Sequence, residues 1–474
     1  MSGELEKIRV VREELNAVSP SFCLAKWKQV TIHLQNGQTH SCHHPGTHKS
    51  PIEEIRKNPS ALHNTQYKKE QRKLMLEGKR PKECQYCWNV EDLPGDHVSD
   101  RAMKSSEPWA YDDFQEVASM PWDYDVKPTY VELSFSNVCN FKCAYCSPVH
   151  SSRWVEEIET HGAYDTSGKF NNLEYFKEQK KMPIHHKEYN PYVEAFWKWL
   201  PDIYPTLKVL RLTGGEPLLD DNVYRILQWI EDNPRPDLEF SINTNGCVPD
   251  KVYDKFLAQL KKLVEAKKIG KVQIFTSVDT AEKQAEWIRT GLDYEKWLAN
   301  MDRILAEIPT VKVVIMCTMN LLSITNFKRL LIDVAHLKYK HYIKGVRHMP
   351  IIIDIATLRW PAQLNAAILP ADYADWLLPS LDYMKRMEEG KNNNPYYLGF
   401  FDLEISKLER FIEHVRTGVH EAEKIDIDNA HRDFYVHVTT HDRRRGTNFL
   451  ETFPELETFY RMCESKWKAK FENA

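Results

Sequence analysis

The stretch "VELSFSNVCNFKCAYC", residues 131–146, places three cysteines within eight residues, directly after a run in which apolar and polar side chains alternate. Alternation with a period of two is typical of a β-strand with one buried face. The cysteines are therefore expected in the loop that leaves this strand. A closed structural metal site normally takes four protein ligands. Three cysteines indicate either a fourth ligand nearby or a coordination position kept for something else.

The spacing C-x3-C-x2-C of Cys139, Cys143 and Cys146 fits two kinds of metal site. With His150, it reads C-x3-C-x2-C-x3-H, which suits a zinc ion held by three thiolates and one imidazole. Without His150, three thiolates would hold a cubane iron–sulfur cluster with one iron open. We favour the cluster, because three further motifs follow at the ends of later strands.

From Thr129 onward, six β-rich runs alternate with amphipathic helical stretches, which is typical of parallel strands joined by helices. The runs are 129–137, 207–215, 238–246, 271–279, 312–320 and 347–354. They predict an α/β fold built on a partial (β/α)6 barrel. Their polar faces are expected to line the barrel interior, and a polar insertion at about 161–190 is expected to cover its mouth.

Three motifs end successive predicted strands after the cysteine loop. They are "TGGEP" at 213–217, "NTNG" at 243–246 and "SVD" at 277–279. Active sites of such barrels collect at the carboxyl ends of the strands. The four motifs therefore predict one ligand site at this rim.

In these motifs and their order, residues 129–354 resemble the radical S-adenosylmethionine (SAM) superfamily. The resemblance implies a [4Fe-4S] cluster on Cys139, Cys143 and Cys146, with SAM bound to its open iron. By position in the motifs, it implies SAM contacts from Tyr145, Gly214, Gly215, Glu216, Ser241, Asn243, Ser277, Asp279 and Arg289.

The resemblance also implies an activity. One electron from a reductant such as flavodoxin or ferredoxin would cleave SAM to a 5′-deoxyadenosyl radical, which takes hydrogen from a polar small-molecule or peptide substrate. Dehydrogenation, epimerisation or bond formation would follow. Cys317 in the fifth strand and Cys247 after the third are expected near the interior, where either could donate hydrogen to a substrate radical.

A second cysteine set lies before the barrel. Cys23 and Cys42 flank a hairpin predicted at Asn36-Gly37, and Cys84 and Cys87 add two thiolates. Four thiolates suit zinc as well as a cluster. The pattern C-x13-G-x4-C followed by C-x2-C resembles the twitch, or shortened SPASM, module and implies an auxiliary [4Fe-4S] cluster. In that family the module usually follows the barrel, whereas here it comes first.

We therefore expect a cysteine-rich unit at 1–98, a linker at 99–128, the barrel at 129–360 and a helical C-terminal region at 361–474. The formal charge of −4, from 64 basic and 68 acidic residues, gives no overall field to attract a polyanion. Nucleic acid is thus not expected as a partner, and an RNA-modifying radical SAM enzyme is the alternative function. A non-enzymatic zinc-binding protein is the third possible function.

No stretch resembles a signal peptide or a membrane span, so we expect a cytoplasmic protein with no membrane partner. In a reducing compartment its ten cysteines are expected to bind metal or remain free thiols, because disulfides are rare there.

Overall fold

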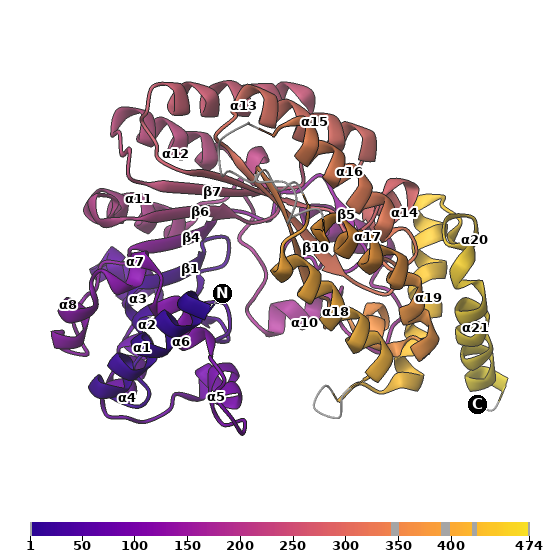
Figure 1. The fold of residues 1–474 in the computed structure, drawn as a ribbon, viewed down its shortest axis with the longest axis horizontal. Coiled ribbons are helices and arrows are strands. Elements are labelled where there is room, and N and C mark those ends of the chain that lie inside the picture. Colours follow the sequence, from indigo (N-terminus) through magenta and orange to yellow (C-terminus); the bar gives the residue numbers. More distant parts are fainter. Residues whose placement is uncertain (1, 343–349, 390–398, 420–423, 473–474) are drawn as a thin grey trace.

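The computed structural model describes residues 2–342, 350–389, 399–419 and 424–472. Within these residues, nine strands form one sheet in the order β11-β10-β8-β7-β6-β4-β1-β2-β3 (Figure 1). The strands are β1 (Gln29–His33), β2 (Gln38–His40), β3 (His48–Lys49), β4 (Tyr130–Ser134), β6 (Val209–Thr213), β7 (Glu239–Thr244), β8 (Val272–Ser277), β10 (Lys312–Met319) and β11 (Ile351–Thr357).

The predicted α/β fold with a parallel sheet is confirmed. The six predicted strands correspond to β4, β6, β7, β8, β10 and β11, and each pairs in parallel with its neighbour. Residues 347–349 of the sixth predicted strand lie outside the described residues.

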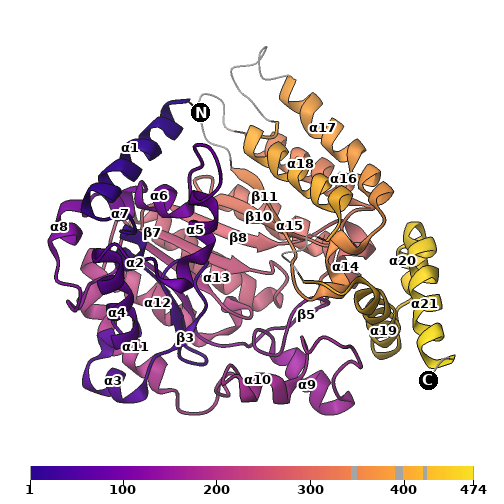
Figure 2. The same ribbon diagram turned by 90° about the horizontal axis from the view of Figure 1, so that it is seen from below.

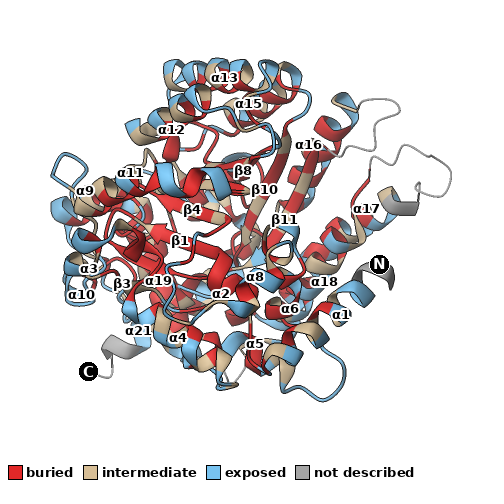
Figure 3. Cartoon of the chain, turned by 90° about the vertical axis from the view of Figure 1, so that its left-hand side faces the viewer, coloured by how far each residue is buried: buried red, intermediate tan, exposed pale blue. Residues whose placement is uncertain are grey.

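Amphipathic helices cover one face of the sheet. They are α11 (Pro191–Ile203), α12 (Asp221–Asp232), α13 (Asp250–Glu265), α15 (Tyr294–Glu307) and α16 (Phe327–Lys340). Figure 1 shows α12, α13 and α15 above the strands. The strand side chains that face them are apolar and fully buried, as at Leu133, Leu212 and Ile242. In Figure 3, buried residues recur along the strands of the sheet. Burial of these apolar side chains provides the main stabilisation of the barrel.

The N-terminal segment is built into the same sheet. Strand β1 pairs in parallel with β4, from Gln29 opposite Tyr130 to His33 opposite Ser134. Strand β2 then returns antiparallel to β1 after the Asn36-Gly37 turn. Around these strands lie α1 (Ser2–Val18), α2 (Leu24–Lys28), α3 (Ile52–Lys57), α4 (Gln66–Leu76), α5 (Gln85–Glu91), α6 (Asp100–Ser105), α7 (Pro108–Tyr111) and α8 (Phe114–Ser119).

The C-terminal helices lie at the β11 end of the sheet, across from the N-terminal segment (Figures 1 and 2). They are α17 (Leu378–Glu389), α18 (Asp402–Thr417), α19 (Ile427–Arg445), α20 (Phe449–Thr452) and α21 (Glu457–Glu472). The polar inward faces of the strands therefore lie between the two terminal regions. Among the described helices, none has the length and apolar character needed to cross a membrane.

Candidate active site

The three-cysteine loop leaves β4 and is fixed by a short ladder that the sequence pattern does not predict. Strand β5 (Lys142–Cys143) pairs antiparallel with β9 (Arg289–Thr290), which follows α14 (Glu282–Ile288). Cys143 thus lies opposite Arg289, and the Ala144 N–H donates to the Ile288 carbonyl oxygen at 2.7 Å. The helix α9 (Ser152–His161) starts soon after the third cysteine. The ladder holds the loop at the rim formed by the strand ends.

The thiols of this loop are partly buried and lie near one another. Burial raises the pKa of Cys146 to about 12, and the neighbouring Cys143 adds to the rise. Burial also raises the pKa of Cys143, while Arg289 opposes the change. The Arg289 Nη1 lies 3.7 Å from the Cys143 Sγ. A bound cation, or the positive charge of a cluster core, would provide the stabilisation that these thiolates need.

A buried hydrogen-bonded network joins three of the residues predicted to contact SAM. Arg289 donates to both Asp279 oxygens, at 2.9 Å each, and also to the Tyr145 hydroxyl. The Tyr145 hydroxyl donates to Asp279 at 2.9 Å, and the Thr318 N–H donates to the same carboxylate at 2.9 Å. The Arg289 guanidinium is already paired with the Asp279 carboxylate. Its further contacts with Tyr145 and Cys143 hold the cysteine loop in position. Direct contact of Arg289 with SAM stays a prediction.

The "TGGEP" motif packs against the cysteine loop. Gly214 has φ +134°, and a Cβ atom at Gly215 would lie 2.4 Å from the Val138 carbonyl oxygen. Close approach of two backbones thus requires glycine here. Glu216 is 1% exposed and accepts from Leu218 N–H at 3.1 Å, Thr244 Oγ1 at 2.8 Å and Asn245 N–H at 2.6 Å. The Glu216 carboxylate thus links the "TGGEP" motif to the "NTNG" motif. Burial raises the pKa of Glu216 to about 7.

The barrel interior carries charge, as the alternating pattern predicted. Arg211 on β6 donates to the Asn243 Oδ1 at 3.0 Å and lies 3.7 Å from a Glu132 oxygen. Its guanidinium carbon also lies 3.9 Å from the ring centroid of Phe275. The register places Ser241 beside Arg211 on the same inward face. An arginine stacked on an aromatic ring and bonded to an amide is well placed to orient an anionic or polar substrate.

Cys317 and Cys247 are the two cysteines expected near the barrel interior. Cys317 lies on the opposite face of its strand, and the Cys247 thiol contacts a backbone carbonyl. Ser277 pairs with Met316 on the inward face, so the adjacent Cys317 points with Ile315 toward the apolar helix layer, where it is 1% exposed. Cys247 is 7% exposed, and its Sγ lies 3.2 Å from the Asp293 carbonyl oxygen. A hydrogen-donor role for either thiol stays a prediction, and the placement of Cys317 does not favour it.

The four N-terminal cysteines line one pocket, which we call the four-cysteine pocket: Cys23, Cys42, Cys84 and Cys87. Three cationic side chains, Lys26, Arg101 and Lys104, line it too. Burial raises the pKa of Cys84 to about 11 and that of Cys87 to about 12. For Cys84, the charge of Lys26 opposes this rise. All ten cysteines of the chain are free thiols.

Both cysteine sets fit iron–sulfur clusters by the chemistry of their donors. The loop offers three thiols, and the Oγ of Ser134 is buried beside Gly214 without a hydrogen-bond partner among the described residues. The four-cysteine pocket offers four thiols among cations, which suits a group of net negative charge. In the described ranges, no three His, Cys, Asp or Glu side chains form a group that could hold a single metal ion. His150 lies near His33, with ring centroids 6.5 Å apart.

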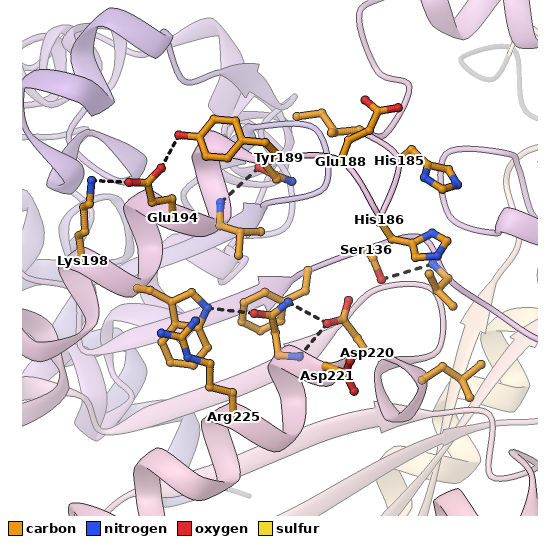
Figure 4. A pocket seen from close by; sticks show the side chains of 18 residues that line it. Ser136, His185, His186, Glu188, Tyr189, Glu194, Lys198, Asp220, Asp221 and Arg225 are labelled. Carbon is orange, nitrogen blue, oxygen red and sulfur yellow. Dashed lines mark hydrogen bonds and ion pairs between the residues drawn. The ribbon is translucent and has the colours of Figure 1, made fainter.

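A separate pocket of about 670 Å³ opens beside the rim, between α11, α12 and the polar insertion (Figure 4). His185, His186 and Tyr189 come from the insertion, while Arg225 stacks on Trp197, 3.7 Å from its ring. The described residues that line this pocket include none of the predicted SAM contacts. The insertion is anchored to the N-terminal hairpin, because the Ile184 N–H donates to the Gln35 carbonyl oxygen at 2.7 Å.

The basic run "HDRRRG" at 441–446 belongs to the last turn of α19 and its cap. Arg444 and Arg445 form ion pairs with the buried Glu157 of α9, at 3.4 and 3.1 Å. Lys142 in the cysteine loop pairs with the same carboxylate at 2.7 Å. This run therefore attaches the C-terminal region to the cysteine loop.

Comparison with known proteins defines the class of this region. Residues 133–330 match the family described as "Radical SAM superfamily", which confirms the radical SAM domain predicted from the cysteine loop. Members of this superfamily are enzymes, and the domain implies SAM and a [4Fe-4S] cluster as cofactors.

Similarity to individual proteins is partial. The chain is 27% identical over 173 residues to the GTP 3′,8-cyclase of Sulfurimonas denitrificans, covering 36% of this chain and 41% of that protein. It is 24% identical over 182 residues to the radical SAM cyclopropyl synthase TigE of Paramaledivibacter caminithermalis, covering 37% and 32%. The chain thus spans less than half the length of these relatives.

Among solved structures, Streptococcus suis SuiB bound to its precursor peptide SuiA is 12% identical, with a TM-score of 0.32, covering 77% of this chain and 70% of that one. This similarity is too low to assign a substrate.

Proposed function

We propose that this protein cleaves SAM reductively and uses the resulting radical to abstract hydrogen from a polar small molecule or peptide. Cys139, Cys143 and Cys146 would hold a [4Fe-4S] cluster, and this group would supply the electron, delivered by an electron-transfer protein, for cleavage of SAM to methionine and the 5′-deoxyadenosyl radical. The observation that carries the proposal is the position of the three-cysteine loop, at the rim of a barrel whose interior is polar.

The protein's own residues have three tasks in this proposal. The Asp279–Arg289–Tyr145 network holds the loop in place. The inward residues Arg211, Asn243 and Glu132 orient the substrate, and the packed rim excludes water from a radical that reacts with whatever is closest. Predicted contacts of SAM with Gly214, Gly215, Glu216, Ser241 and Ser277 belong to the same proposal.

We further propose that the four-cysteine pocket holds an auxiliary [4Fe-4S] cluster. Its closed set of thiols and its cationic lining support electron transfer as its role. A cluster held there by the four thiols would serve as an electron acceptor during a two-electron oxidation of the substrate. The 5′-deoxyadenosine formed retains the abstracted hydrogen.

Anaerobic reconstitution with iron, sulfide, SAM and dithionite tests the proposal. The wild-type chain should bind about eight irons with sulfide and form 5′-deoxyadenosine, detected by liquid chromatography. Cys143→Ala should form none, whereas Cys463→Ala, a buried cysteine outside both sets, should match the wild type. Bound zinc without sulfide, or equal product from Cys143→Ala, would refute the proposal.

A further inference from the structure

Lys104 on α6 lies against a thiol of the four-cysteine pocket. Its Nζ donates to the Cys42 Sγ at 3.1 Å. The nearest carboxylate, Asp100, is farther away at 3.8 Å. Asp100 is also bonded more closely to His44, whose Nε2 lies 2.7 Å from it. The lysine side chain is 16% exposed, so solvent screens its charge only in part.

The other two cations of the pocket are already neutralised. Lys26 is 2% exposed and forms a short contact with the buried carboxylate of Glu83. Arg101 is 3% exposed and donates to Glu91 at 2.8 and 3.2 Å. Among these three cations, Lys104 is thus the one that contacts a thiol at 3.1 Å while its carboxylate neighbour lies farther away, at 3.8 Å.

The charge of Lys104 is also felt on the inward face of the sheet. Burial raises the pKa of Glu132 on β4, and the positive charges of Arg211 and Lys104 oppose this rise.

We propose that Lys104 is a positioning residue that raises the reduction potential of the cluster in the four-cysteine pocket. This inference rests on the proposed function. Reduction adds a negative charge to a desolvated group, and a charged N–H donor to a ligand sulfur stabilises the reduced form more than the oxidised form. The pocket thereby becomes a better electron acceptor for a substrate radical than its four thiolates alone would make it.

The test is a redox titration of the full-length reconstituted protein, followed by electron paramagnetic resonance. All variants carry Cys143→Ala as well, so that only the cluster of the four-cysteine pocket is observed. Lys104→Met should make the reduction equilibrium about tenfold less favourable, a shift of about 59 mV to more negative potential. Lys104→Arg should retain the wild-type potential. Lys79→Met, which removes an exposed lysine outside the pocket, should also leave the potential unchanged.

The outcomes separate this inference from the proposed function. If the pocket holds iron and sulfide but Lys104→Met has the wild-type potential, Lys104 does not set it, while the proposed function stands. If the pocket holds zinc, both the auxiliary cluster and the role of Lys104 are wrong. If Lys104→Met fails to retain iron, Lys104→Gln replaces it in the titration, and a potential equal to that of Lys104→Arg overturns the inference.

Discussion

The three-cysteine loop and the four-cysteine pocket differ in how the cations near their buried thiols are paired. In the loop, the cation nearest a thiol, Arg289, is neutralised by the buried Asp279. In the pocket, Lys26 and Arg101 are paired with carboxylates, while Lys104 contacts a thiol directly. Thiolates cost less to bury near a positive charge. Under the proposed function, the loop with its three thiols leaves a coordination position for SAM, whereas the pocket offers four thiols of the chain itself.

The two sites also differ in how the chain assembles them. The three thiols of the loop come from eight consecutive residues, and the β5–β9 ladder holds this segment in place. The pocket brings together cysteines separated by up to 64 positions, from Cys23 to Cys87. The loop can form once the barrel has folded, whereas the pocket depends on how α2, α5 and α6 pack together.

The largest expected effect separates the two cysteine sets directly. Cys143→Ala should lower 5′-deoxyadenosine formation by roughly 100-fold or more, because a ligand of the SAM-binding cluster is lost. Cys87→Ala should still form 5′-deoxyadenosine without substrate, since it affects the other site. Iron and sulfide analysis should find about four irons in each variant. If Cys87→Ala also abolished 5′-deoxyadenosine, the two sites would not be independent.

The next effect tests the buried network under the loop. Asp279→Asn leaves the Arg289 guanidinium buried without its carboxylate, which should cost about 3–5 kcal/mol of unfolding free energy. Urea unfolding of the iron-free chain, followed by tryptophan fluorescence, measures the loss. Asp254→Asn is the matched control, because it breaks an ion pair with Arg303 in which both side chains are about half exposed. It should cost no more than about 1 kcal/mol. Equal losses would show that the network is not what stabilises the loop.

The strands and the cysteine loop could be predicted from the sequence. Alternation of apolar and polar side chains and the spacing of motifs are both properties of consecutive residues. Two parts of the site could not be predicted in this way. The β5–β9 ladder joins residues 143 and 289, which share no local signal. Lys104 belongs to a short helix of ordinary composition, and its contact with Cys42 arises only when α6 packs against the hairpin. Glu216 is one of the predicted SAM contacts, and the sequence pattern does not show that its oxygens also accept from three donors of the chain itself.

The smallest expected effect concerns acid stability near the four-cysteine pocket. His63 is fully buried, its Nε2 lies 2.7 Å from the Trp27 carbonyl oxygen and its Nδ1 lies 3.3 Å from the Lys68 Nζ. Burial lowers its pKa well below the ordinary value of 6.5, and Lys68 and Arg72 add to this shift. Since α2 carries Trp27 beside the pocket, protonation of His63 should weaken this region.

The sign of the pH dependence follows from the lowered pKa. Below about pH 6.5 the unfolded chain binds a proton that the folded chain does not, so the free energy of unfolding falls as the pH decreases. The contribution of His63 is at most about 1.4 kcal/mol per pH unit. His63→Gln retains a donor and an acceptor but cannot titrate. Urea unfolding of the iron-free chain at pH 6.5 and 5.5 should therefore show about 1 kcal/mol less acid destabilisation in His63→Gln than in the wild type. His161→Gln, which changes an exposed histidine at the end of α9, should behave as the wild type. An identical pH dependence in all three proteins would show that His63 takes up a proton in the folded state.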